Sequence, residues 1–268
     1  DPSLGTTRVG FAVRPRDDRS RKSLGTIFAV EGGPGYSSTG SAKYYTRLFR
    51  GLLRRRDLVL VDTRGTGISD ALRCGDSQKR KIPQRSVVRR CAQQLGARFF
   101  SYRTQAAADD IEAVRTALGL GDILLYGDSY GSFLAQTYAY RHGEHIGRLV
   151  LDGSYQIAGE SPWYVSGPRT GIRALSLACS RSPGCPPGSR SRLIRAVAKM
   201  RRSGTDVKPL VNEIWSAGSY GAPQTYVAID RALRRYLAGA PNPFPGGFEK
   251  QGTGGLRAFS RAMEVVFS

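Results

Sequence analysis

Short continuous runs of apolar residues recur through the first 153 positions of the chain, and longer segments with helical spacing separate them. The clearest runs are 57–61, 123–126 and 148–151. Runs of this length are typical of strands in a parallel sheet that helices cover on both faces. The segments 41–53 and 105–118 carry their apolar residues on one helical stripe. This alternation predicts an α/β fold with a mostly parallel sheet.

The amino-terminal part adds two apolar runs, at 9–13 and 25–30, with a charged turn between them. Short strands on either side of such a turn are typical of a hairpin, so we expect a β-hairpin at one edge of the sheet. Farther along, Thr104 stands directly before a helical segment that has two acidic residues near its start. This arrangement predicts Thr104 as the N-cap of that helix.

The pattern changes after residue 153. From residue 154 onward no apolar run is typical of a buried strand, and residues 239–255 are rich in Gly and Pro. We therefore expect a sheet-forming core over 1–153 and a helical lid over 154–268. The helices expected in the lid are 191–202, 207–217, 225–237 and 256–267.

The pentapeptide Gly127-Asp128-Ser129-Tyr130-Gly131 follows one predicted strand and precedes an apolar helical segment. A Gly-x-Ser-x-Gly motif between a strand and a helix indicates a nucleophile elbow. The turn is so tight that the residues flanking the serine must be small, and glycine also tolerates positive φ. Ser129 is therefore the candidate catalytic nucleophile.

The chain is strongly basic, with 41 Lys and Arg against 21 Asp and Glu and a formal net charge of +20. The arginines run along the whole chain, and their densest clusters have no interleaved aromatic residues of the kind that single-strand nucleic-acid binders use. We interpret the charge as solvated surface and expect no nucleic-acid partner. No apolar run approaches the roughly 18 residues that a membrane span needs, so no transmembrane segment is expected.

The four cysteines form two local pairs, Cys74 with Cys91 and Cys179 with Cys185. Neither pair has zinc-site spacing and the chain has only two histidines, so we expect no metal site. An even count in local pairs predicts two disulfides and an oxidising compartment. Three connectivities are open, of which the local one closes the shortest loops, and four buried free thiols are the alternative.

Four short motifs stand in order along the chain. They are Gly32-Gly33-Pro34-Gly35, Asp62-x-Arg64-Gly65-x-Gly67-x-Ser69, the elbow around Ser129, and Leu151-Asp152-Gly153. Together they resemble the proline iminopeptidase and tripeptidyl aminopeptidase family of α/β-hydrolases, most closely its secreted actinobacterial branch, over most of residues 25–185. The resemblance implies a secreted or cell-envelope serine exopeptidase, without a cofactor, that releases short peptides or single residues from substrates with a free N-terminus.

The resemblance also implies roles for individual residues. Ser129 matches the nucleophile, and the backbone N–H groups of Gly33 and Tyr130 match the oxyanion hole. Family members often have His where this chain has Glu31. For the turn of the second motif, we expect an ion pair between Asp62 and Arg64 that braces the elbow; binding of a substrate carboxylate by Arg64 is the alternative.

The base that would activate Ser129 is missing from the expected place. A serine hydroxyl needs a neighbouring base, and the only histidines are His142 and His145. Both follow the elbow at the far end of its helix, roughly 15–20 Å away. The resemblance implies that an acid and a histidine follow on two more strands, in a C-terminal segment of the same hydrolase or on a second chain. Asp152 is an alternative acid, although the family places the acid later.

Three functions stay open at this point. The first is a serine aminopeptidase whose α/β-hydrolase sheet is incomplete at its C-terminal end in this chain. The second is an esterase or amidase on the same fold, since fold does not fix substrate. The third is a non-catalytic binding protein. An aminopeptidase needs lid carboxylates to hold the substrate ammonium, although each candidate is more typical of a surface charge. The candidates are Glu160, Asp206, Glu213 and Asp230.

Overall fold

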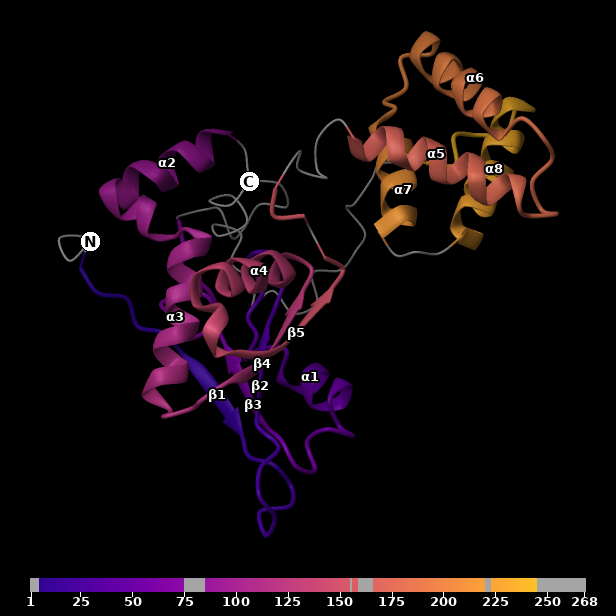
Figure 1. Ribbon diagram of the computed structural model, residues 1–268. Coiled ribbons are helices and arrows are strands. Elements are labelled where there is room, and N and C mark those ends of the chain that lie inside the picture. The colour runs from indigo at the N-terminus through magenta and orange to yellow at the C-terminus, as the bar shows by residue number, and fades with distance from the viewer. Residues whose placement is uncertain (1–4, 75–84, 155, 159–165, 220–222, 245–268) are drawn as a thin grey trace. The chain divides into compact units, whose positions relative to one another are not determined.

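The computed structural model describes residues 5–74, 85–154, 156–158, 166–219 and 223–244 (Figure 1). Contacts between Cα atoms divide the chain into two units, with the boundary between Ile157 and Ala158. The first unit contains the sheet and the second contains only helices among its described residues. No described helix combines the length and the apolar character that a bilayer crossing requires.

The first unit is built on a five-stranded sheet with the order β1-β3-β2-β4-β5. The neighbours of β2 and of β4 run parallel, and β1 alone is antiparallel to its neighbour β3. This mixed, mostly parallel sheet confirms the predicted α/β fold. The strands are β1 Phe11–Arg14, β2 Thr26–Val30, β3 Asp57–Val61, β4 Ile123–Asp128 and β5 Ile146–Asp152.

The predicted hairpin at the sheet edge is wrong. β1 pairs with β3, so that Phe11 lies opposite Val61, and it makes no ladder with β2. All five residues of β2 are buried, and both edges of β2 are occupied, by β3 and by β4. A strand that is buried along its whole length belongs in the middle of a parallel sheet. β1 alternates between exposed and half-buried residues, which suits an edge strand.

Helices cover both faces of the sheet and make three layers (Figure 1). Alternate residues of β2 point to opposite faces. Phe28 packs with the side chains of α3 and α4, whereas Ile27 packs with Tyr45 of α1. The helices of this unit are α1 Ala42–Leu48, α2 Arg85–Leu95, α3 Thr104–Ala117 and α4 Tyr130–His142.

Two of the predicted helices differ in detail from the structure. The helix expected over 41–53 ends at Leu48, and the chain continues in turns to Leu53, which is buried. Thr104 is the first residue of α3 and Arg103 takes the N-cap position. The Thr104 hydroxyl instead lies 3.0 Å from the Tyr130 hydroxyl, which ties α3 to the start of α4.

The second unit packs four helices around an aliphatic and aromatic core. They are α5 Ser166–Ser180, α6 Ser189–Arg202, α7 Lys208–Ser219 and α8 Pro223–Leu237. The sequence predicted α6, α7 and α8 to within a few residues and missed α5 and, in the first unit, α2. The helix expected over 256–267 lies outside the described residues.

Two disulfides and one buried ion pair stabilise local parts of the chain. Cys74 is bonded to Cys91 and Cys179 to Cys185, in the local pairing that the spacing favoured. In the second unit, Arg192 donates to Asp230 at 2.8 Å and to the carbonyl oxygens of the two prolines that follow Cys185. A small helical unit with a limited core gains stability from such cross-links.

The carboxylate of Glu112 on α3 provides a testable link between α3 and α4. It accepts hydrogen bonds from Arg115 and from the Tyr138 hydroxyl of α4. The bonds from Arg115, against a smaller opposing effect of burial, lower the pKa of Glu112 from 4.5 to about 2. A depressed pKa in the folded state stabilises the protein above the unfolded-state pKa, and this stabilisation is lost as the pH falls through the folded-state pKa.

We therefore predict that Glu112→Gln destabilises the first unit by about 1–2 kcal/mol at neutral pH, because charge-assisted hydrogen bonds are lost. The difference in unfolding free energy from the wild type should be constant above pH 4.5 and shrink between pH 4.5 and about 2. Chemical denaturation across this pH range measures it. Glu144→Gln, at an exposed carboxylate, is the control. A difference that does not change with pH would contradict the assignment.

Candidate active site

Ser129 stands at a sharp turn between β4 and α4. Its backbone has φ 53° and ψ −118°, which a residue with a side chain adopts rarely. Its N–H donates to the carbonyl oxygen of Asp152, at the end of β5, at 2.8 Å. Such backbone strain at a functional residue persists only where the surroundings hold it. The strand-turn-helix geometry is that of a nucleophile elbow.

The two glycines of the elbow stand where no larger residue fits. A Cβ on Gly127 would lie 2.1 Å from the carbonyl oxygen of Gly131. A Cβ on Gly131 would lie 2.3 Å from the carbonyl oxygen of Val30, at the end of β2. Real Cβ atoms do not approach backbone so closely, so the main chains of β2, β4 and α4 are in direct contact. The motif that the sequence displays is therefore a steric requirement of this turn.

The loop after β2 lies against Ser129. A Cβ on Gly32 would lie 2.8 Å from the Cβ of Ser129 and 3.3 Å from its Oγ. Gly33 follows with φ +112°, in the region that favours glycine, and precedes a cis peptide bond to Pro34. The backbone of this loop is thus brought to the serine hydroxyl, where a family oxyanion loop is expected.

Asp62, directly after β3, is hydrogen-bonded to the same loop. Its fully buried carboxylate accepts a hydrogen bond from the Ser37 hydroxyl at 2.9 Å, and from the N–H and hydroxyl of Thr39 at 2.9 and 2.7 Å. It also accepts from the N–H of Ile68 at 2.9 Å. One carboxylate therefore cross-links the loops that follow β2 and β3.

The predicted ion pair between Asp62 and Arg64 is wrong. Arg64 instead makes a two-point contact with Asp110 of α3, at 2.7 and 2.6 Å, and donates to the carbonyl oxygen of Ser101 at 2.7 Å. Hydroxyl and amide donors already surround the Asp62 carboxylate, so it has no need of a cation. Arg64 braces the β3 loop against α3.

Three carboxylates stand at the carboxyl ends of the adjacent strands β2, β4 and β5, at the sheet edge where Ser129 lies. They belong to Glu31, Asp128 and Asp152, and the sheet register puts Asp128 directly opposite Asp152. Tyr45 donates to Glu31, and Tyr126 donates to Asp152 at 2.6 Å. None of the three has a Lys, Arg or His partner among the ion pairs of the described residues.

Burial raises the pKa of Glu31, against the lowering effect of the Tyr45 hydrogen bond. Burial and the neighbouring charge of Asp152 raise the pKa of Asp128. Sequence reasoning treated these carboxylates singly and missed the group. The signal that could have found it is their shared position at the carboxyl ends of strands, which meet at one edge of a parallel sheet.

Both histidines lie at the far end of α4, as expected. His142 contacts Asp109 at 2.9 Å, and His145 lies 3.7 Å from Glu112 and from Glu144. His142 is the last residue of a 13-residue helix that begins directly after Ser129, which separates the two by roughly 20 Å. Neither imidazole can reach the Ser129 hydroxyl.

The other predicted site residues fall into different environments. The Tyr130 side chain is buried, and its hydroxyl lies 3.0 Å from that of Thr104. Glu213 is exposed on α7, and Asp206 is exposed just before that helix. Glu160 lies outside the described residues.

Asp230 is fully buried and contacts Arg192 at 2.8 Å and Arg234 at 3.2 Å. Its ion pairs give Asp230 a role in packing the helical unit, where both carboxylate oxygens are engaged by arginines. Its carboxylate also lies within 4.8 Å of the sulfurs of Cys179 and Cys185. Those sulfurs are joined in a disulfide, so this group offers no thiolate to a metal ion.

Several proteins are similar to this chain in sequence. Serine protease Hip1 of Mycobacterium tuberculosis is 26% identical over 193 residues, covering 62% of this chain and 37% of that protein. The tripeptidyl aminopeptidase of Streptomyces lividans is 26% identical over 162 residues, covering 52% and 30%. Carboxylesterase B of M. tuberculosis is 31% identical over 214 residues, covering 70% and 41%. The chain thus spans well under half of the length of these relatives.

The family model described as the alpha/beta hydrolase fold matches residues 25–170, which is more than half of the chain. The matched region contains the sheet from β2 to β5, the loop after β2 and the elbow at Ser129. The architecture, the strained serine and this match agree, and the chain belongs to the α/β-hydrolase fold family.

Proposed function

We propose that this chain carries the nucleophile of a serine hydrolase that removes residues or short peptides from substrates with a free N-terminus. The observation that carries the proposal is the elbow, in which a strained Ser129 contacts the glycine loop after β2. A binding protein without catalysis has no need of this strained arrangement. The two disulfides favour a secreted or cell-envelope location.

In the proposed reaction, the Ser129 oxygen attacks the substrate carbonyl carbon, and its proton passes to a base. The backbone N–H groups of Gly33 and Tyr130 donate hydrogen bonds to the oxyanion that forms, and the N-terminus of α4 adds a favourable dipole. The leaving amine takes the proton, and an acyl-enzyme remains on Ser129. Water then attacks the acyl-enzyme, which releases the peptide acid and restores the hydroxyl.

The base has to come from outside the two histidines of this chain. His142 and His145 are held by carboxylates at the end of α4 remote from Ser129. We infer that an acid and a histidine are supplied by a C-terminal segment of the same hydrolase, either continuous with this chain or on a second one. The helical unit that begins at Ala158 would then serve as the lid of the complete site.

The strand-end carboxylates favour a substrate with a positive charge. Glu31, Asp128 and Asp152 stand at the strand ends next to Ser129 and have no basic partner among the described residues, in a chain whose net charge is +20. A free N-terminal ammonium would supply the missing charge. The similarity to a tripeptidyl aminopeptidase supports this choice. The similarity to carboxylesterase B favours a second candidate, an esterase on the same scaffold.

Ser129→Ala should lower hydrolysis of an aminoacyl arylamide by about a thousandfold or more, because no other group can form the acyl-enzyme. The melting temperature should stay unchanged, since the hydroxyl serves chemistry rather than packing. Steady-state assays of the complete hydrolase, with its C-terminal segment present, test the first expectation. Thermal unfolding of the same protein tests the second. Hydrolysis at the wild-type rate by the variant would remove Ser129 from the mechanism.

Asp128→Asn should raise KM for a substrate with a free N-terminus by about tenfold, the effect of losing one charged hydrogen bond. KM for the N-acetylated substrate and for a simple ester should stay unchanged. In the wild type, KM for the free amine should rise as the pH falls through the pKa of Asp128, which burial and Asp152 raise above 3.8. An equal effect on all three substrates would favour the esterase.

A further inference from the structure

An aliphatic groove runs between α5, α6 and α7 of the helical unit. Its volume is about 630 Å³. Two of its large aliphatic side chains are open to solvent, Ile194 at 60% and Val211 at 38% of their surface. The aliphatic side chains that line it are Ile172, Leu193, Ile194, Val197, Leu210, Val211 and Ile214. Aliphatic side chains that are exposed together in a concave surface are typical of a binding groove.

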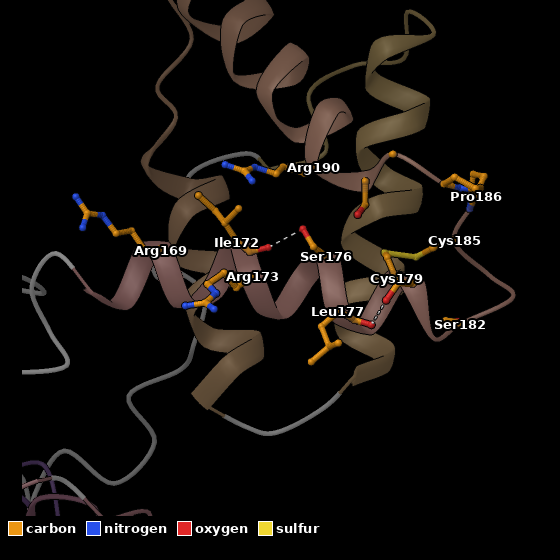
Figure 2. A pocket seen from close by; sticks show the side chains of 14 residues that line it. Arg169, Ile172, Arg173, Ser176, Leu177, Cys179, Ser182, Cys185, Pro186 and Arg190 are labelled. Carbon is orange, nitrogen blue, oxygen red and sulfur yellow. Dashed lines mark hydrogen bonds between the residues drawn. A yellow bond between two sulfur atoms is a disulfide. The ribbon is translucent and has the colours of Figure 1, made fainter.

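An arginine-rich basin adjoins the groove. It has a volume of about 1190 Å³ and lies along α5 and the segment that leads into α6 (Figure 2). Figure 2 shows Arg169, Arg173 and Arg190 around Ile172. Ile172 and Arg190 line both the basin and the groove. The two hollows therefore adjoin at Ile172 and Arg190. The groove is apolar along its length, with Arg190 at the end beside the basin and Arg201 and Arg202 at the other end.

The basin arginines have no acidic partners in the part of the chain that the structure describes. No described carboxylate lies within ion-pair distance of Arg169, Arg173 or Arg190, whereas the neighbouring Arg192 is bound to Asp230. α6 begins at Ser189 next to the basin, and its N-cap Gly188 makes no side-chain cap. The positive end of this helix adds to the charge of the three guanidinium groups.

We propose that this surface binds a single-chain anionic amphiphile of the fatty-acid class. The carboxylate would lie at Arg169, Arg173 and Arg190, where guanidinium groups can hold it with two-point hydrogen bonds. The acyl chain would lie in the groove along α6. The groove is concave and falls within the usual size range of ligand pockets, which suits one chain rather than the plane of a bilayer.

The length of the groove agrees with such a ligand. Arg190 at the start of α6 and Arg201 near its end both line the groove, and the rise over the eleven residue steps from one to the other is about 16 Å. A ligand of this length with charge at one end would bury its chain against Leu193 and Val197. The proposal does not depend on the chemistry of Ser129.

Titration calorimetry of the Ser129→Ala chain tests the proposal without turnover. The probes are dodecanoate below its micelle concentration, dodecanol, and dodecyltrimethylammonium. We expect saturable binding of one dodecanoate per chain, about tenfold weaker binding of dodecanol because the charged hydrogen bonds are missing, and no binding of the cation. Absence of saturable dodecanoate binding would overturn the proposal, as would equal binding of all three probes.

Substitutions in the basin and in the groove test the carboxylate site and the acyl-chain site separately. Combined Arg169→Gln, Arg173→Gln and Arg190→Gln should reduce dodecanoate affinity to that of dodecanol and leave dodecanol affinity unchanged. The charge control replaces three exposed arginines of the first unit, Arg47, Arg50 and Arg54, and should bind like the wild type.

Ile194→Asn should weaken the binding of both dodecanoate and dodecanol, because it places a polar group in the groove. Ile68→Asn, at a side chain of matched exposure in the first unit, should weaken neither. If the charge control weakens dodecanoate as much as the basin variant, the binding is general attraction to a basic protein and the assignment of the site is wrong. Binding to anionic vesicles that survives the basin and groove variants, with no dodecanoate binding, would likewise contradict it.

Discussion

Three strand ends bring their main chains into contact around Ser129, and only glycine fits at the points of contact. Gly127 and Gly131 touch across the turn, and Gly131 also touches the last residue of β2. The strained serine is held by the hydrogen bond from its N–H to Asp152. Because these contacts join β2, β4 and β5, the order of the central strands and the position of Ser129 are set together. A side chain at either glycine would have to push the strands apart.

The loops that surround the serine depend on a second buried element, Asp62. Its carboxylate satisfies donors from two loops at once, and Gly67 has φ +46° beside it, where a Cβ would lie 2.0 Å from a carboxylate oxygen. A buried charge is stable only when hydrogen bonds replace its hydration. Removing this carboxylate would leave several buried donors without a partner, so the glycine loop near Ser129 would lose its fixed position.

The sequence predicted those parts of the fold that local pattern decides. The central strands, the elbow and the local disulfide pairs carry their signal in neighbouring residues. Prediction from the sequence failed where contacts between residues far apart in the chain decide the structure. β1 leaves β2 because both edges of β2 are taken by parallel strands, and Arg64 finds its partner 46 residues away on α3. α5 contains Gly and Pro and has weak helical propensity; a Cβ on its Gly171 would meet Ile214 of α7 at 2.8 Å, so close packing rather than propensity holds this helix.

The proposed function requires that Ser129 be preformed as a nucleophile and that its base be neither of the two histidines of this chain. Labelling of the 1–268 chain with a fluorophosphonate, read by intact mass and peptide mapping at Ser129, tests this directly. We expect slow labelling that added imidazole accelerates, because the small base can take the serine proton, and no change when His142 and His145 are both replaced by Asn. Labelling at the rate of an ordinary serine hydrolase without imidazole would contradict the account, because a base within residues 1–268 would then activate Ser129.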